Sequence, residues 1–229
     1  MSGCGQTAVS YDNPYDVYAT TADLGLSGTG ECVEQTYFSE NLCVIDDTNI
    51  GTDGTHSNVA EGAGVFNLAT GTVNYAQNIY EKLYPASTTK ILTAYLALKY
   101  GNLDDLVTVS EYAAKQASDS SVCGLKAGDV VSLHDLLYGM MLKSGNDAAI
   151  AIAEHLSGSV EAFADLMNQE ANAMGATRSH FVNPNGLPDE DHYTSVYDLK
   201  WFFCQSFQTF LPDPVCIQCI ILTWDCCSN

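Results

Sequence analysis

A helix that is apolar on every side must be buried, and residues 91–98 (ILTAYLAL) predict such a helix. Lys90 stands directly before this stretch, and Ser87 lies three residues before Lys90. Residues three apart on a helix share a face, with Cβ atoms about 5–6 Å apart. Burial disfavours the charged form of a lysine, and a serine becomes a nucleophile when a neighbouring base takes its proton. Ser87 and Lys90 are therefore candidates for a nucleophile and its general base.

A purely structural interpretation of these residues is the alternative. A serine and a lysine at this spacing arise about once by chance in a chain of this length. Ser87 would then cap the helix, and Lys90 would lie at the surface. Two features weigh against this interpretation. Pro85 and Ala86 favour an entry turn that delivers Ser87 to the first helical turn, and a lysine at the head of a core helix is costly without a role.

The chain is strongly acidic, with a formal net charge of −20 and eight Lys and Arg residues in a length of 229. Binding to nucleic acid or to an anionic membrane needs a basic surface, so we expect neither partner. The longest candidate for a membrane-spanning stretch, residues 215–224, is shorter than the ~20 apolar residues required. The apolar content of 46% is ordinary for a globular domain with a sizeable core.

The first five residues, MSGCG, resemble the end of a bacterial lipoprotein signal, in which a pair of small residues precedes the lipidated cysteine. On this interpretation Cys4 carries a lipid, and the apolar part of the signal has been lost from the sequence. The alternative is a plain flexible N-terminus, and the residues do not decide between the two.

The nine cysteines allow two further hypotheses. Four of them form a Cys-x-x-Cys pair and an adjacent pair that suggest zinc: Cys216, Cys219, Cys226 and Cys227. The spacing between these pairs is short for a zinc site and no histidine follows Cys204, so we predict no metal. Cys32 and Cys43 would form a disulfide if the chain is exported, or would remain buried free thiols.

Three regions differ in composition. Residues 1–60 predict an extended polar leader with one strand at 42–45, residues 61–200 a folded domain, and residues 201–229 an atypical cysteine-rich tail. Within the domain, strands at 64–68 and 72–76 predict a hairpin, and a turn is expected at 128–129. Helices are predicted at 110–117, 133–142, 147–156, 160–174 and 194–205, besides the one that follows Ser87. The pattern favours an α+β domain whose sheet is completed by later strands.

A second polar constellation, Ser144-Gly145-Asn146, lies at the break between two predicted helices. A short loop in which Ser144 or Asn146 caps the second helix is the structural interpretation. Beside Ser87 and Lys90, the chemical interpretation gains weight. A second hydroxyl can relay a proton between base and leaving group, and a side-chain amide can hold a substrate carbonyl or the lysine.

Ser-x-x-Lys followed by Ser-x-Asn resembles the penicillin-recognising serine enzymes. Longer strings resemble one branch of them, the D-alanyl-D-alanine carboxypeptidases or low-molecular-mass penicillin-binding proteins. These strings are YPASTTK at 84–90, LKSGNDAA at 142–149, and FVNPNGLP at 181–188 with HYT at 192–194. The resemblance covers residues 62–199. It implies a penicillin-binding-protein/β-lactamase-like transpeptidase fold of the α+β class, with the helical subdomain intact and the antiparallel sheet incomplete at the C-terminus.

The resemblance also implies roles for residues. Ser87 would attack the carbonyl between the two terminal D-alanines of a peptidoglycan stem peptide, and Lys90 would be its general base. Ser144 would pass the proton to the departing D-alanine, and Asn146 would bind substrate and position Lys90. β-Lactams would acylate Ser87, and no cofactor is implied. An exported protein of the cell envelope is expected, and no catalytic role is expected for the histidines at 134, 155, 180 and 192.

One family motif, Lys-Thr-Gly or His-Thr-Gly, is missing. It should follow Asn146 by roughly a hundred residues, where it would bind the substrate carboxylate and supply part of the oxyanion hole. After Lys200 the sequence holds no Lys, Arg, His or Gly. We therefore expect a frame shift or a truncated gene model near residue 200, with a truly divergent tail as the alternative. If the later strands are absent, the hairpin at 64–76 lacks partners. An inactive penicillin- or peptidoglycan-binding sensor is the alternative function. A class A β-lactamase is disfavoured because no plausible deacylating Glu loop is found.

Overall fold

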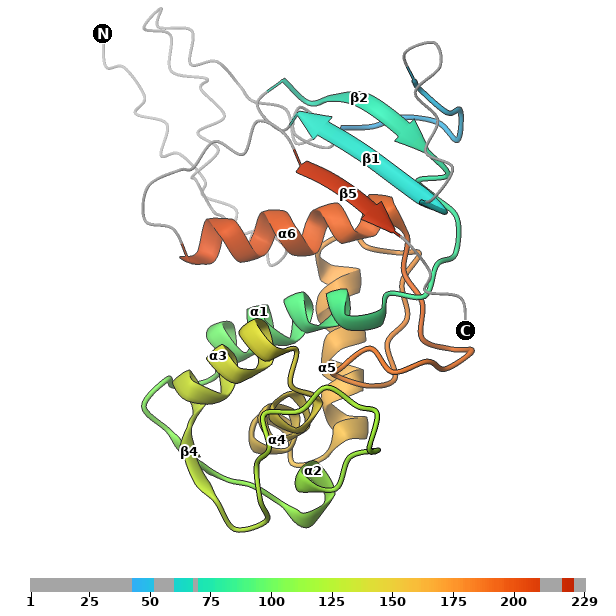
Figure 1. Cartoon of the computed structure of the whole chain (residues 1–229). Helices are drawn as coiled ribbons and strands as arrows, with labels where there is room; N and C mark the ends of the chain where they lie inside the picture. The colour runs from blue at the N-terminus through green and yellow to red at the C-terminus, as the bar shows by residue number, and fades with distance from the viewer. Residues whose placement is uncertain (1–42, 52–59, 68–69, 211–219, 225–229) are drawn as a thin grey trace, which may run out of the picture.

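The structure is a computed structural model with an α+β fold, and it describes residues 43–51, 60–67, 70–210 and 220–224, with side chains as far as Cys204 (Figure 1). A three-stranded sheet lies against α6, and a group of helices lies on the other side of α6. The elements are, in chain order, β1 (Gly62–Asn67), β2 (Thr72–Gln77), η1 (Ala86–Thr88), α1 (Thr89–Tyr100), β3 (Leu106–Thr108), α2 (Glu111–Ala114), β4 (Val130–Ser132), α3 (Leu133–Lys143), α4 (Asn146–Ser157), α5 (Val160–Ala173), α6 (Val196–Phe210) and β5 (Ile220–Trp224).

The sheet has the order β2-β1-β5 and is antiparallel throughout. β1 and β2 form the predicted hairpin, with an irregularity in register between Val65 and Phe66. β5 pairs with the free edge of β1. The hairpin therefore has one later partner strand, and the case in which it lacks partners does not arise. The run Ile-Ile-Leu-Thr-Trp in the tail is rich in β-branched and aromatic residues, which favour a strand. The strand was not predicted because the composition of the tail around it is atypical.

Two glycines of β1 allow α6 to pack closely on the sheet. A Cβ on Gly62 would lie 2.9 Å from Val196 Cγ2, and one on Gly64 would lie 3.2 Å from Val196 Cγ1. Val196 is buried in the first turn of α6. Ser195 caps this helix, because its Oγ accepts a hydrogen bond from the backbone N–H of Asp198 at 3.1 Å.

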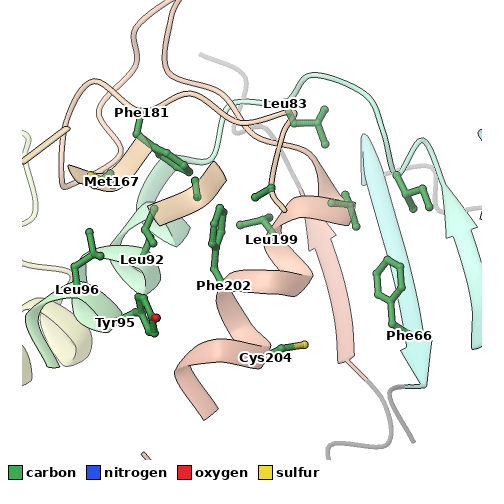
Figure 2. Packing of buried hydrophobic residues seen from close by; sticks show 14 of the residues in the cluster. Phe66, Leu83, Leu92, Tyr95, Leu96, Met167, Phe181, Leu199, Phe202 and Cys204 are labelled. Atoms are coloured by element: carbon green, nitrogen blue, oxygen red, sulfur yellow. The ribbon is translucent and has the colours of Figure 1, made fainter. Parts of the chain in front are cut away.

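α1 lies between two hydrophobic clusters, which explains why its sequence is apolar on every side. Leu92, Tyr95 and Leu96 belong to the cluster that includes Phe202 of α6, and Phe202 lies between Leu92 and Leu199 (Figure 2). Ala97 belongs to the second cluster, which is formed with α3 and α4. The prediction of a core helix after Ser87 is confirmed, although its first turn is the 3-10 turn η1.

The other long predicted helices are present within a few residues of their expected bounds, as α3, α4, α5 and α6. The helix expected at 110–117 is shorter, because α2 covers only Glu111–Ala114, after Ser110 as its cap. The small sheet of β3 and β4 was not predicted. Each of its strands has three residues, too few for alternation to be recognised in the sequence.

The described part of the predicted leader packs against the domain. Residues 43–45 are not a strand, so the prediction of a strand at 42–45 is wrong. This segment pairs with the sheet further along the chain, where Ile50 forms a β-bridge with Ala76. Tyr80 holds this segment by donating to the carbonyl oxygen of Ile45 at 2.6 Å. Cys43 is a fully buried free thiol. Its possible partner Cys32 lies outside the described residues.

The other cysteine hypotheses also fall outside the described residues. They concern Cys4 and the four candidate zinc ligands of the tail. Among the residues that the structure does describe, no group of three or more His, Cys, Asp or Glu side chains is arranged to hold a metal ion. No helix in that part of the chain is long and apolar enough to cross a membrane.

Candidate active site

Ser87 lies in a tight turn at the start of α1. The turn η1 is entered through Pro85, whose φ is −68°. Ala86 has φ +43°, a left-handed conformation that is uncommon for a residue with a side chain. Strained backbone of this kind clusters at functional sites. No side-chain cap hydrogen bond is made at the start of η1 or of α1, so the hydroxyl of Ser87 does not serve as the cap that the structural interpretation required.

Lys90 is buried at the head of α1, with 2% of its surface exposed. Its Nζ lies 3.2 Å from Ser87 Oγ and 3.2 Å from Ser144 Oγ, and it donates to the backbone carbonyl oxygen of Asn185 at 2.8 Å. Burial lowers the pKa of Lys90 from 10.5 to about 8. An amine with this pKa can release and accept a proton near neutral pH, as a general base must.

Ser144 reaches the same point from the end of α3. It has φ +56°, and Gly145 follows as the cap residue of α4 without a side-chain cap bond. The sharp turn places Ser144 Oγ 3.0 Å from Ser87 Oγ, with Ser144 as donor. The hydroxyl of Ser87, the hydroxyl of Ser144 and the amine of Lys90 thus lie within 3.2 Å of one another.

A loop at 181–187 also contacts Lys90. In the sequence, this loop was notable only for its resemblance to the family. Its contribution to Lys90 is a backbone carbonyl, that of Asn185, which no residue type reveals. Gly186 has φ +84°, and a Cβ there would lie 1.7 Å from the carbonyl oxygen of Ala86. In the sequence, the glycine of Asn-Pro-Asn-Gly is the residue that could have indicated this close approach of two backbone segments.

Asn146 is buried in the first turn of α4. The sequence predicted that it positions Lys90, but its side chain makes no hydrogen bond to the Lys90 amine. Its Nδ2 donates to Ser120 Oγ at 2.6 Å, and its backbone N–H donates to the carbonyl oxygen of Ser121 at 2.8 Å. The carbonyl of Asn185 makes the contact with Lys90 instead. The loop that contains Ser120 and Ser121 therefore fixes the amide of Asn146.

Asp147 fixes that loop to α4. Its buried carboxylate accepts hydrogen bonds from the backbone N–H groups of Cys123, Gly124 and Leu125 at 2.9–3.0 Å. These three charge-assisted bonds to successive backbone groups hold Asp147 rigidly, and Asn146 precedes it directly in the chain. This role of Asp147 was not predicted, because nothing in the sequence distinguishes Asp147 from the other residues of LKSGNDAA.

The four histidines make no hydrogen bond to Ser87, Lys90 or Ser144 in the described structure. His155 lies 3.2 Å from Asp105, and His134 lies 3.7 Å from Asp135. His180 is exposed, with Nδ1 bonded to the carbonyl oxygen of Asp191. His192 is buried and contacts Thr89 Oγ1 at 2.9 Å, one residue before the candidate base.

This geometry can perform nucleophilic catalysis. A hydroxyl is activated when an amine or imidazole base lies within about 2.6–3.2 Å of it, and a second hydroxyl can carry the proton onward. Lys90 and Ser144 meet this distance condition around Ser87. The arrangement needs no metal ion to generate its nucleophile.

Comparisons with known proteins agree with this chemistry. The family D-alanyl-D-alanine carboxypeptidase (peptidase S11) matches residues 52–218. The carboxypeptidase DacF of Bacillus subtilis is 41% identical over 145 residues, which are 61% of this chain and 37% of that protein. The carboxypeptidase DacC of Escherichia coli is 40% identical over 144 residues, 59% of this chain and 36% of that protein.

Solved structures give the same result for the fold. The D-alanyl-D-alanine carboxypeptidase DacD of Francisella tularensis is similar with a TM-score of 0.62 at 35% identity, over 74% of this chain and 40% of that one. Penicillin-binding protein 5 of Haemophilus influenzae is similar with a TM-score of 0.63 at 34% identity, over 71% of this chain and 48% of that one. The α+β fold is therefore that of the penicillin-binding D,D-peptidases.

The chain spans between about a third and a half of the length of the curated relatives it matches. The matched region nevertheless holds both polar constellations, and it extends over most of the chain. This chain belongs to the D-alanyl-D-alanine carboxypeptidase family, peptidase family S11.

Proposed function

We propose that this chain is a serine D-alanyl-D-alanine carboxypeptidase that removes the terminal D-alanine from peptidoglycan stem peptides through an acyl-enzyme on Ser87. The observation that carries the proposal is the contact of three groups from separate elements. Ser87 Oγ lies 3.2 Å from the buried amine of Lys90 and 3.0 Å from Ser144 Oγ. The family match supports the reaction class.

In the proposed acylation, neutral Lys90 Nζ takes the proton of Ser87 as Oγ attacks the carbonyl carbon between the two D-alanines. The tetrahedral intermediate collapses when the C–N bond breaks. Ser144 donates its proton to the departing D-alanine nitrogen and recovers one from Lys90, to which it is already hydrogen-bonded. Water then hydrolyses the ester, which releases the shortened peptide and restores Ser87.

We assign Asn146 to substrate binding. Asn146 follows Ser144 by two residues, it is buried, and Ser120 fixes the orientation of its amide. A fixed amide can donate to a substrate carbonyl without reorganisation during the reaction.

The proposed partners follow from the reaction. Peptidoglycan stem peptides are the substrates, and β-lactams are inhibitors that acylate Ser87 in place of the peptide. Because these substrates lie outside the cytoplasmic membrane, we propose an exported protein of the cell envelope. Lipidation of Cys4 remains a prediction from the sequence alone, and incorporation of labelled palmitate that is lost in Cys4→Ser would support it.

Release of D-alanine from a pentapeptide ending in D-Ala-D-Ala tests the proposed function. We expect release by the full chain and none by Ser87→Ala. Ser132→Ala is the matched control, because Ser132 also presents a hydroxyl but caps α3, where it accepts from Asp135 N at 3.0 Å. The control should lose about 1 kcal/mol of stability and keep its activity. Equal release by the full chain and Ser87→Ala would contradict the proposal.

A second candidate is a binding or sensor protein that is acylated but turns over nothing. The observation that favours it is that residues 201–229 hold no Lys, Arg, His or Gly, so this stretch cannot supply the third family motif. Loss of one oxyanion-hole donor typically costs about 10²–10³ in rate. Covalent labelling of Ser87 by penicillin without release of D-alanine would support this second candidate.

A further inference from the structure

Three residues of α1 hold the loop that carries Asn185. Lys90 donates to the carbonyl oxygen of Asn185 at 2.8 Å, and Thr93 Oγ1 donates to that of Pro184 at 2.7 Å. Thr89 Oγ1 is the third point, 2.9 Å from His192 Nε2. Thr89 and Thr93 are four residues apart, so they lie on one face of the helix on either side of the base.

The hydrogen bonds of His192 define its tautomer. The backbone N–H of Val182 donates to Nδ1 at 3.1 Å, so Nδ1 carries no proton. Nε2 therefore carries the proton and donates to Thr89 Oγ1. The ring is 1% exposed and packs edge-on against Phe181 with centroids 5.5 Å apart. Burial lowers the pKa of His192 to about 4, with Asp189 acting in the opposite direction and His180 in the same one.

This imidazole thus joins the two ends of the loop to the helix. Val182 is at the start of the loop, His192 is at its return, and Thr89 adjoins Lys90 in sequence. The loop has little room to shift, because Gly186 lies against the carbonyl of Ala86. A displacement of the loop would carry the Asn185 carbonyl away from Lys90 and would admit water to the amine.

We propose that His192 is a positioning residue, which pins the loop at 181–193 to Thr89 through its neutral ring and so keeps the Asn185 carbonyl on the amine of Lys90. It acts through Lys90 and does not touch the reacting atoms. The role of His192 in catalysis rests on the proposed function. Its effect on the surroundings of the Lys90 amine does not, and this effect can be measured without any turnover.

The test is the titration of Lys90 in the full chain, followed by NMR of ¹³Cε-labelled lysine, with Lys90→Gln used to assign its resonance. Thr89→Val removes the hydroxyl at nearly constant shape. His192→Asn removes the same bond from the other side, while its Oδ1 can still accept from Val182 N. We expect both variants to raise the pKa of Lys90 from about 8 toward 10.5, because water replaces the loop.

Two controls separate positioning from general structure. Thr89→Ser keeps the hydroxyl and should leave the titration of Lys90 unchanged. His180→Asn alters an exposed histidine directly before the loop, whose Nδ1 bonds the carbonyl of Asp191. This variant should also leave the titration of Lys90 unchanged. The resonance of Lys99, which pairs with Glu170 Oε2 at 2.7 Å and lies over the ring of Tyr100, reports whether folding is preserved.

Each outcome bears on the proposal. A raised Lys90 pKa in both Thr89→Val and His192→Asn, with a double variant no worse than either, supports it. Folded variants in which Lys90 titrates as in the unaltered chain would overturn it. If penicillin fails to acylate the unaltered chain, the proposed function fails, but the titration still decides the role of His192.

Discussion

Lys90 is the residue on which the chemistry of the site depends. Its amine lies among two hydroxyls and one backbone carbonyl, and burial is the cause of its lowered pKa. A protonated amine can donate to both hydroxyls but cannot remove a proton from either. The active form of the site is therefore the one with neutral Lys90.

The rate of acylation by a penicillin should consequently depend on pH. We expect the rate to rise as pH increases from 6 and to level off above about 8, where Lys90 is mostly neutral. Stopped-flow measurement with a chromogenic β-lactam would follow this profile. Lys90→Arg, whose guanidinium stays protonated, should lose more than about 10²-fold of the rate at pH 8. A flat profile between pH 6 and 9 would contradict the assignment of Lys90 as base.

At the scale of elements, the site is made by the meeting of the turn η1, the end of α3 and the loop at 181–187. The loop packs against the turn at Gly186, which has φ +84°. A side chain there would meet backbone atoms of Ala86, and these cannot rotate away as a side chain can.

Gly186→Ala should therefore destabilise the chain by more than about 2 kcal/mol and abolish acylation. Gly175→Ala is the matched control, because Gly175 has φ +86° but nothing lies within 4 Å of an added Cβ. The control should cost only the strain of the left-handed conformation, about 1–2 kcal/mol. Urea unfolding of both variants gives the comparison. Equal losses would show that the contact with Ala86 has no energetic weight.

The elements also indicate what sequence can predict. The long helices were found because an apolar stripe, or apolar residues all round in α1, repeats over ten or more residues. β3 and β4 were missed because three residues carry no period, and β5 was missed because the composition around it is atypical.

The site was predicted in the same uneven way. Ser87, Lys90 and Ser144 are chemically distinctive side chains, so their spacing in the sequence drew attention to them, and the structure places them together. The carbonyl of Asn185 and the buried ring of His192 were not predicted. A backbone oxygen leaves no mark on residue type, and the burial of a histidine depends on tertiary packing.

At the scale of the whole molecule, a neutral buried histidine makes the fold sensitive to acid. The unfolded chain carries His192 with a pKa near 6.5, whereas the folded chain carries it with a pKa of about 4. Between these values the unfolded state binds more protons. The contribution of neutral His192 to the free energy of unfolding is therefore fully present above pH 6.5, and it is lost as pH decreases toward 4.

The loss due to His192 should be about 3 kcal/mol between pH 7 and pH 4. Chemical denaturation of the unaltered chain and of His192→Asn at several pH values would measure it, since the difference between the two removes the contributions of other groups. The unaltered chain should lose its advantage over the variant as pH falls through this range. A difference that is independent of pH would contradict the buried neutral state of His192.

The central claim is that Ser87 is a nucleophile activated by Lys90, and intact-mass spectrometry after incubation with benzylpenicillin tests it most directly. We predict one adduct per chain, equal in mass to the penicillin, that maps to the peptide containing Ser87. The adduct should be absent in Ser87→Ala and should form far more slowly in Lys90→Arg. A folded chain without an adduct, or an adduct that persists in Ser87→Ala, would contradict the account.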